Sequence, residues 1–512
     1  MVHMPTLSII LVNYKVPHFL EHCLLSVRRA SVGMDVETIV VDNASGDGSI
    51  ELLSPRFPEV NFIQSDQNLG FAKASNLGYR ASSGSIVLFL NPDTLLSEGS
   101  LRGSVEYLIN NPQTGSLGIR MIDGTGRFLP ESKRAFPDPA TAFYKIIGLA
   151  KLFPRSPRFA RYHLGHLSPD QDHSIDVVSG AFFMAPRAVL EKVGLFDEDF
   201  FMYGEDVDLS YRIRQAGYSN HYFSGSTILH FKGESTQKQS VKYVKLFYGA
   251  MSQFVRKHRL NNGFFRGGIQ IAIALRAMAS LFRRVIQRIG IPIFDWALIL
   301  MSFFLARYGW STQVRPEVNY PSDFSLPLSA YALIFYLTAF FSGVHSAPFR
   351  WKNHFRSLLM ASGVLLVVYS LLPESLRYSR GIVTVGSIAS IGLITAWRLL
   401  LLRLQLISRF TEQHLQFPLL FIGTEKSRRD IQRLYPDQPP AAFLLLEPES
   451  STDLLVKRLD DYYSIIRFSD VVCCLDDLPA QLVFDLMMRP GNHFSYRFYA
   501  SGAEAILPLR KW

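Results

Sequence analysis

Cysteine is scarce in this chain of 512 residues, which contains only three. Cys473 and Cys474 are adjacent in a predicted buried strand, and Cys23 lies on the predicted core face of a helix. Internal repeats and low-complexity tracts are missing as well. The cysteine pattern excludes a disulfide framework and a zinc site of the usual ligand spacing, and it fits a reducing compartment.

Two recognisable segments are also missing. The apolar run at 7–12 is too short for a cleavable signal peptide, so we expect none. The turn after residues 418–422 holds the single Gly423 and no G-x-G-x-x-G pattern, so no dinucleotide is assigned there. Apolar residues, in contrast, are plentiful: they make up 48% of the chain, and the mean hydropathy is +0.12. These values indicate several membrane spans, and the length indicates three regions.

Strands alternate with helical segments near the N-terminus. Short apolar runs occur at 7–12, 36–41, 60–63 and 88–90, and residues 17–29 have the apolar spacing of a helix. This alternation predicts βαβ units and a mixed, mostly parallel sheet in an α/β domain.

Polar residues follow these strands at one predicted rim of the sheet. Because ligands bind at the carboxyl ends of strands in open α/β sheets, the residues at this rim are candidates for a site. They are Tyr14, Asp42, Asn43, Gly70 and Asp93. The carboxylate of Asp93, in Asn91-Pro92-Asp93, can hold a divalent cation against a diphosphate. The alternative reading is that Asp93 caps an ordinary turn, since Asn-Pro commonly opens turns.

Residues 7–234 resemble the inverting family 2 glycosyltransferases of GT-A fold, and within them the rhamnosyltransferase-like branch. Five motifs in the right order carry the resemblance: Val12-Asn13-Tyr14, Val41-Asp42-Asn43-Ala44-Ser45, Asn68-Leu69-Gly70-Phe71, Asn91-Pro92-Asp93, and Ser179-Gly180-Ala181 through Gly204-Glu205-Asp206-Val207-Asp208-Leu209.

The resemblance implies a donor site and a divalent cation, Mn²⁺ or Mg²⁺. The metal ligands would be Asp93 of the DxD-type motif and His230, although a lone His is more often structural. This chain has Asn91 where the family has an acid, which leaves the metal with one carboxylate fewer. The residues implied to bind the donor are Tyr14, Asp42, Asn43, Gly70, Asn76, Asn91 and Gly180. Asp42 and Asn43 also suit an Asx-turn, and the helix after Gly70 would turn its positive end toward a phosphate.

A second acidic group occurs at the start of a predicted helix. Inversion needs one carboxylate within hydrogen-bond reach of the acceptor hydroxyl. The resemblance implies that Asp206 is this base, with Glu205 as its acidic neighbour. Acidic residues are also favoured at helix starts by the dipole alone. Asp208 is predicted to pair with Arg212, four residues on.

Basic and aromatic residues are interleaved between 121 and 177, including Lys133, Arg134 and Tyr162. This mixture suits an anionic membrane surface or the diphosphate of a lipid-linked acceptor. Nucleic acid is the other reading of such a segment, and the net charge of +10 permits it, but the apolar remainder of the chain argues against it.

The second half predicts membrane segments. Residues 269–289 read as an amphipathic interfacial helix. Four apolar stretches, at about 291–306, 326–345, 357–373 and 381–402, have lengths that match the hydrocarbon core. A modest bias of Lys and Arg beside them places both termini in the cytoplasm.

The spans and the tail resemble a second family, the membrane and regulatory portion of polyprenyl-phosphate glycosylphosphotransferases. Asp295, Arg377-Tyr378-Ser379-Arg380-Gly381 and Trp397-Arg398 carry this resemblance. Apolar runs at 418–422, 442–446 and 471–475 predict a small Rossmann-like tail. Since the phosphotransferase domain of that family is not found before Trp512, we expect no initiating phosphotransferase activity.

Taken together, the sequence predicts four regions: a GT-A domain at 1–260, an interfacial helix at 261–290, about four membrane helices at 291–410 and a Rossmann-like cytoplasmic domain at 411–512. The leading hypothesis is a metal-dependent, inverting glycosyltransferase of the bacterial inner membrane. It would move a sugar, with rhamnose as the candidate, from a dTDP- or UDP-linked donor to a polyprenyl-diphosphate-linked glycan, alongside other polysaccharide-assembly enzymes. Two alternatives remain: a processive synthase, whose Gln-x-x-Arg-Trp motif we do not find, and a non-catalytic scaffold of an assembly complex.

Overall fold

The computed structural model describes residues 6–138, 140–141, 144, 148–231, 241–258, 290–317, 325–346, 349–377, 379–403, 419–434, 442–445, 452–465, 468, 470–489, 494–500, 503 and 505–507. The chain forms two compact units, one comprising 1–274 with 416–512 and the other comprising 275–415. The predicted amphipathic helix at 269–289 lies outside the described residues, as do Phe143, Lys145 and Tyr378. The four predicted domain boundaries stay predictions.

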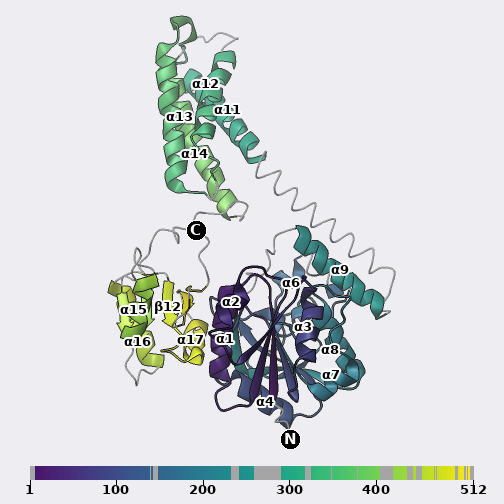
Figure 1. The fold of residues 1–512 in the computed structure, drawn as a ribbon. Coiled ribbons are helices and arrows are strands. Elements are labelled where there is room, and N and C mark those ends of the chain that lie inside the picture. The colour runs from purple at the N-terminus through teal and green to yellow at the C-terminus, as the bar shows by residue number, and fades with distance from the viewer. Residues whose placement is uncertain are drawn as a thin grey trace. The chain divides into compact units, whose positions relative to one another are not determined.

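A mixed sheet of nine strands forms the centre of the N-terminal domain (Figure 1). Its strands are β1 (Leu7–Asn13), β2 (Val36–Asp42), β3 (Val60–Gln64), β4 (Ile86–Leu90), β5 (Thr94–Leu96), β6 (Thr114–Ile122), β7 (His173–Ile175), β8 (Phe182–Pro186) and β9 (Ser219–His230). Their order is β3-β2-β1-β4-β8-β6-β9-β5, with β7 beside β9. The helices are α1 (Pro17–Ala30), α2 (Ser49–Leu53), α3 (Gly70–Arg80), α4 (Ser100–Asn110), α6 (Leu149–Leu152), α7 (Arg187–Val193), α8 (Glu205–Gln215) and α9 (Val241–Lys257).

The strands β3, β2, β1 and β4 are parallel, as the alternation of strands and helices predicts. Asn13 of β1 is paired with Asp42 of β2, and Leu11 of β1 with Leu90 of β4. Three consecutive strands therefore end at almost the same level. This register confirms the predicted rim. Because β8 runs antiparallel to β4, its first residue, Phe182, lies beside Leu90 at the same rim.

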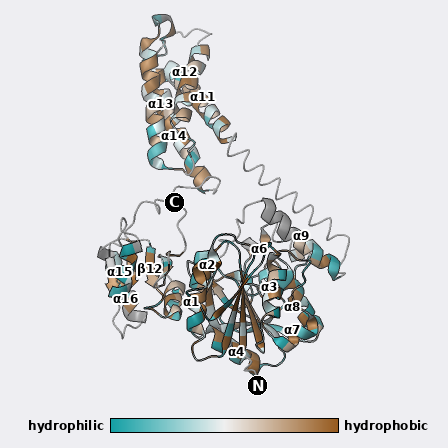
Figure 2. Ribbon diagram, in the orientation of Figure 1, coloured by the Kyte–Doolittle hydropathy of each residue, from teal (hydrophilic) through white to brown (hydrophobic). Residues whose placement is uncertain are grey.

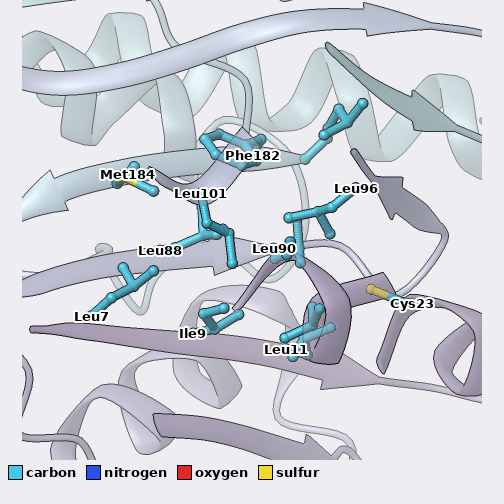
Figure 3. Packing of buried hydrophobic residues seen from close by; sticks show 14 of the residues in the cluster. Leu7, Ile9, Leu11, Cys23, Leu88, Leu90, Leu96, Leu101, Phe182 and Met184 are labelled. Atoms are coloured by element: carbon cyan, nitrogen blue, oxygen red, sulfur yellow. The ribbon is translucent and has the colours of Figure 1, made fainter. Parts of the chain in front are cut away.

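The core lies between this sheet and the helices that cover it. Alternate residues of β1 and β4 contribute apolar side chains to one cluster, in which Leu11 lies opposite Leu90 of β4 and Leu90 lies opposite Phe182 of β8 (Figure 3). Cys23 of α1 belongs to this cluster and is fully buried, which confirms its predicted place on the core face. Each such leucine contributes roughly 1.5–3 kcal/mol by leaving water. The packed core fixes the strand ends that carry the candidate site.

The described part of the second unit contains four apolar helices: α11 (Ile291–Gly309), α12 (Ser325–Phe341), α13 (Trp351–Leu371) and α14 (Arg380–Arg403). Among the described residues, three of them are long and apolar enough to cross a membrane; these are α11 with its continuation to Val314, α13 and α14. The described part of α12 has 17 residues and counts as a shorter apolar helix. Apolar residues dominate along these helices (Figure 2). The four helices correspond to the four predicted stretches.

One ion pair is buried within this helical unit. Asp295 of α11 and Arg398 of α14 are 1% and 2% exposed, and the guanidinium donates to both carboxylate oxygens. His345, which follows α12, lies 3.5 Å from the same carboxylate. Asp295 is therefore a partner of Arg398 inside the helical unit, rather than a charge at an interface.

The C-terminal domain is a small parallel α/β fold, as the tail pattern predicts. Its strands are β10 (Leu419–Gly423), β11 (Ala442–Leu445), β12 (Asp470–Cys474) and β13 (Ser495–Tyr499), in the order β11-β10-β12-β13. Its helices are α15 (Glu425–Leu434), α16 (Thr452–Ile465) and α17 (Ala480–Met488). Asp477 accepts hydrogen bonds from the amide and the hydroxyl of Thr424, at 2.7 and 3.0 Å. A carboxylate of the protein thus lies at the start of α15, where Rossmann-like domains commonly bind phosphate.

Candidate active site

The predicted metal ligands lie together at the end of the sheet. β5 pairs with β9 so that Thr94 is opposite His230, and this places Asp93 next to the imidazole. His230 Nε2 is 3.3 Å from Asp93 Oδ1, and both side chains are buried. The amide of Phe231 also donates to the backbone oxygen of Asp93, at 2.9 Å. Two residues far apart in the chain are thereby fixed against each other.

These two side chains fit a divalent cation shared with a substrate. Within the described part of the chain, no group of three or more His, Cys, Asp or Glu is arranged to hold a metal ion alone. Mn²⁺ and Mg²⁺ bound with nucleotides often take only one or two protein ligands and complete their shell with phosphate oxygens and water. The buried Nδ1 of His230 has no hydrogen-bond partner among the described residues, so this ring retains an unused polar atom. The donor set therefore fits a metal–diphosphate site.

Asp42 and Tyr14 differ in exposure at the ends of β2 and β1. The carboxylate of Asp42 is buried and accepts from Asn13 Nδ2 at 2.8 Å and from the amide of Ser45 at 3.1 Å. The carboxylate of Asp42 thus closes a local turn, but its partner amide is three residues on rather than the two residues of an Asx-turn. Tyr14 is 40% exposed, so its ring is accessible to a base. The donor-binding roles of both residues stay predictions.

Asn43 ties the end of β2 to the turn before α3. Its side chain accepts from the amide of Leu69 at 2.7 Å and donates to the oxygens of Asn68 and Gly70 at 3.1 and 3.2 Å. The amide of Gly70 is taken by Asn68 Oδ1, at 3.0 Å, and the amide of Phe71 by the oxygen of Phe201, at 2.8 Å.

The glycine at position 70 has a structural reason of its own. Its φ is +78°, and a Cβ there would overlap the carbonyl oxygen of Phe201. The first amides of α3, predicted to face a phosphate, are engaged by protein acceptors instead. Gly70 is thus required for the close approach of Phe201, and a phosphate contact by Gly70 stays a prediction.

Asn76, another predicted donor residue, holds a loop. It lies on α3, is 2% exposed, and donates to the oxygen of Phe196 at 2.8 Å and to Glu198 at 3.1 Å. This loop leads into the acidic helix α8. In this structure Asn76 therefore positions the segment that carries the predicted base.

Asn91 and Gly180 connect the metal side to the base side. The amide of Asn91 donates to the oxygen of Ala181 at 3.1 Å, so the Asn-Pro-Asp turn lies beside the Ser-Gly-Ala turn. The amide of Gly180 donates to Asp206 Oδ2 at 3.1 Å. A Cβ at Gly180 would be 3.6 Å from the Cβ of Asp206, an ordinary contact. The Asn-Pro-Asp turn that carries Asp93 therefore lies beside the Ser-Gly-Ala turn, which binds Asp206 at the start of α8.

Asp206 and Glu205 open α8 and differ in their surroundings. Asp206 receives three donors: Gly180, its own neighbour Val207 at 2.8 Å, and the guanidinium of Arg134 at 2.5 Å. Glu205 is buried, and its Oε2 has no partner among the described residues. Burial and the adjacent charge of Asp206 raise the pKa of Glu205 to about 8. At neutral pH Glu205 is therefore mostly protonated.

Asp208 forms the predicted contact on the same helix. Arg212 Nε donates to Asp208 Oδ2 at 2.7 Å, which confirms the expected pairing four residues apart. Lys257 of α9 and His258, which follows it, also contact Asp208, at 3.0 and 2.7 Å. These partners fully engage Asp208, and its role is to hold α8 against α9.

Arg134 is the site residue that sequence reasoning does not single out. It stands among the basic and aromatic residues at 121–177, yet its guanidinium reaches the predicted base 72 positions away. Tyr162 lies beside it and interacts with its side chain. No local pattern marks this contact, because it depends on an isolated bridge between Arg134 and Val177.

The chain is similar to proteins of known family. Residues 8–194 match the model of the family described as glycosyl transferase family 2. The N-acetylglucosaminyl-diphospho-decaprenol L-rhamnosyltransferase of Mycobacterium tuberculosis is 28% identical over 249 residues, which cover 46% of this chain and 80% of that protein. Rhamnosyltransferase WbbL of Escherichia coli K12 is 27% identical over 156 residues, or 30% of this chain and 54% of that protein. Among solved structures, a mannosyltransferase of Pyrobaculum calidifontis in complex with GDP-Man and Mn²⁺ aligns with 16% identity and a TM-score of 0.37, over 78% of this chain and 88% of that one.

Proposed function

We propose that this chain, whose residues 8–194 form a family 2 glycosyltransferase domain, transfers a sugar from a nucleotide-diphosphate donor to a lipid-linked glycan with inversion at the anomeric carbon. One observation carries the proposal. The buried pair of Asp93 with His230 lies at the Asn-Pro-Asp turn, and the adjacent Ser-Gly-Ala turn binds the carboxylate of Asp206 at the start of α8.

The two groups suit the two ends of a displacement reaction. Asp206 would take the proton of the acceptor hydroxyl, whose oxygen then bonds to the anomeric carbon as the bond to the diphosphate breaks. The nucleoside diphosphate leaves with the bonding electron pair. Asp93 and His230 would hold Mn²⁺ or Mg²⁺, which when bound stabilises the charge that develops on the leaving diphosphate.

Glu205 supports the choice of Asp206 as the base. Because the pKa of Glu205 is raised to about 8, this carboxyl is mostly protonated at neutral pH. A protonated carboxyl cannot accept the proton of a hydroxyl. Glu205 is therefore not available as a base, which leaves Asp206 as the single base of the two.

The sugar and the acceptor are proposed from the relatives. The M. tuberculosis protein is, by its name, an L-rhamnosyltransferase acting on N-acetylglucosaminyl-diphospho-decaprenol. We therefore propose rhamnose on dTDP, with UDP-linked sugars as the other donors to test, and a polyprenyl-diphosphate-linked glycan as acceptor. The three helices long enough to span a membrane agree with an acceptor held in a bilayer. We place the protein in a bacterial inner membrane, with both termini cytoplasmic and other assembly enzymes as partners.

The full chain, purified in detergent, can test this function. Binding and turnover of a panel of nucleotide sugars would be measured with Mn²⁺, with Mg²⁺ and with a chelator. The variants are Asp93→Asn and Asp206→Asn, and the control is Asp170→Asn, which removes an exposed carboxylate of the same domain.

Asp93→Asn should lose metal-dependent donor binding. Asp206→Asn should keep binding and lose about 10²–10⁴-fold in transfer, the usual contribution of a general base. Asp170→Asn should behave like the wild type. If no donor binds the wild-type protein in the presence of either metal, the catalytic proposal fails and a scaffold role replaces it.

A further inference from the structure

The predicted base is closed off in this structure. Oδ1 of Asp206 accepts from Val207, and Oδ2 accepts from both Gly180 and Arg134. A carboxylate has about four acceptor positions, so three of them are already used. The shortest contact, at 2.5 Å, is also an ion pair. A carboxylate oxygen that already accepts from a guanidinium is less available to take the proton of an acceptor hydroxyl.

The backbone of Arg134 is fixed, whereas its guanidinium is incompletely paired. Its carbonyl accepts from the amides of Asp176 and Val177, at 3.2 and 3.0 Å, which anchors the residue beside the Ser-Gly-Ala turn. The guanidinium also donates to the oxygen of Val178 at 3.0 Å, but the buried Nε has no partner among the described residues. A charged group with an unused buried donor is incompletely satisfied where it lies.

The surroundings of Arg134 suit a second anion. The segment that holds Tyr162 is tied to Arg134 through the bond from the amide of Ala135 to the oxygen of Tyr162, at 2.9 Å. The same segment exposes three cationic side chains, those of Arg155, Arg158 and Arg161. A diphosphate attracts guanidinium groups strongly, because each can donate two parallel hydrogen bonds to its oxygens. The acceptor of the proposed reaction carries such a diphosphate next to its sugar.

We propose that Arg134 masks the base Asp206 in the free enzyme and releases it when the diphosphate of a lipid-linked acceptor binds the guanidinium. This inference rests on the proposed function and adds a positioning residue with a second, acceptor-binding position. The consequence is that the donor is not hydrolysed when no acceptor is bound, because Asp206 is held by Arg134 and does not activate water against the donor sugar. With acceptor, the same diphosphate that identifies the substrate frees the base.

A permanent positioning role gives a different expectation. If Arg134 only held Asp206 in place, its loss would lower hydrolysis of the donor and transfer to the acceptor by the same factor. Under the masking role, its loss raises hydrolysis without acceptor while it weakens the use of diphosphate-linked acceptors. The ratio of hydrolysis to transfer therefore separates the two.

The test compares full-length wild type with Arg134→Gln, Arg134→Lys and a control, Arg214→Gln. Arg214 lies on α8, as Asp206 does, and pairs with Asp176, so the control removes a guanidinium–carboxylate pair from the same helix without touching the base. Each protein is assayed for donor hydrolysis without acceptor, and for transfer to a sugar on a polyprenyl diphosphate and to a neutral glycoside of that sugar.

We expect Arg134→Gln to raise hydrolysis about 10-fold or more and to raise the KM for the diphosphate acceptor, with transfer to the neutral glycoside maintained. Arg134→Lys should restore the masking in part. Equal losses of hydrolysis and transfer, or unchanged hydrolysis, would overturn the inference.

A measurement on the unaltered protein protects the test from a variant that does not fold. Farnesyl diphosphate, a short polyprenyl diphosphate without sugar, should stimulate donor hydrolysis by the wild type when the metal is in excess. Arg134→Gln should not respond to it. An absence of stimulation in a wild type that does transfer sugar overturns the masking role alone, whereas a wild type that binds no donor overturns the proposed function and this inference with it.

Discussion

Replacing Glu205 by Gln should change how the stability of the protein depends on pH. The side chain is buried, and its pKa rises from 4.5 to about 8 because burial and the charge of Asp206 disfavour its ionised form. At 1.36 kcal/mol for each pH unit, this shift corresponds to roughly 5 kcal/mol as an upper bound. The charge of Arg134 lowers the pKa of Glu205, so the size of the shift depends on burial, Asp206 and Arg134 together.

The direction follows from which state holds the proton. Below pH 4.5 both the folded and the unfolded chain keep Glu205 protonated, and its contribution to stability is fully present. Between pH 4.5 and about 8 the unfolded chain releases the proton while the folded protein keeps it. The folded state therefore loses stability as pH rises, and the loss is complete above the folded pKa. Glutamine has no proton to release, so the variant escapes this loss.

Thermal unfolding of the full chain in detergent, between pH 5 and 9, measures the effect. The Tm of Glu205→Gln minus that of the wild type should grow with pH up to about 8 and then stay level, by on the order of 10 °C at most. Glu191→Gln, an exposed change on α7, should give a flat difference. A flat difference for Glu205→Gln would refute the reasoning, because it would mean that Glu205 is ionised in the folded protein.

Two other substitutions test packing that the site depends on. Gly70→Ala should lower the stability by about 1–2 kcal/mol because of its left-handed backbone, and by more because of the overlap with Phe201. It should also lower transfer activity. Gly99→Ala, with open space around it and an ordinary φ of −86°, should change neither stability nor activity. Equal stability and activity for both variants would contradict the tight approach of Phe201. Arg398→Met should lower the stability of the helical unit by roughly 3–5 kcal/mol, because it leaves Asp295 buried and unpaired, and the double change Asp295→Leu with Arg398→Met should recover most of it in thermal unfolding. If single and double variants unfold alike, the pair does not stabilise the fold.

The rim of the sheet could be predicted from the sequence because its causes are local. An apolar run that ends in a polar turn marks the end of a strand, and alternation with helices makes the strands parallel. Asp42 and Asp93 follow from these two rules alone, and the observed register of β1 with β2 and β4 places them as expected. The pairing of Asp208 with Arg212 was predictable for the same reason, since both residues lie one turn apart on a single helix.

The contacts that complete the site are not local, and spacing cannot reveal them. His230 reaches Asp93 through the pairing of β5 with β9, and was predicted only by resemblance to a family. Arg134 reaches Asp206 across 72 positions, through one bridge to Val177, and was not predicted. The pairing of Asp295 with Arg398, across 103 positions, likewise needs two helices to pack side by side.

Asparagine shows a subtler reason why sequence is insufficient. In a polar turn at a strand end, an amide that binds a ligand and an amide that closes a turn have the same sequence signal. Asn43 and Asn76 were both predicted to contact the donor. In the structure Asn43 holds the turn before α3, and Asn76 holds the loop at Phe196. Only the three-dimensional arrangement of their partners shows this structural role, and the contact of either amide with the donor stays a prediction.

These amides also show why the donor side and the base side act as one site. The amide of Phe71, at the start of α3, donates to the oxygen of Phe201, and Asn76 of the same helix donates to the oxygen of Phe196. Two hydrogen bonds therefore join α3 to the segment that leads into α8. That segment delivers Asp206. A displacement of the turn before α3 would therefore reach Asp206 through two hydrogen bonds. Since the core beneath is close-packed and resists deformation, these bonds are a shorter path to Asp206 than a change in the sheet.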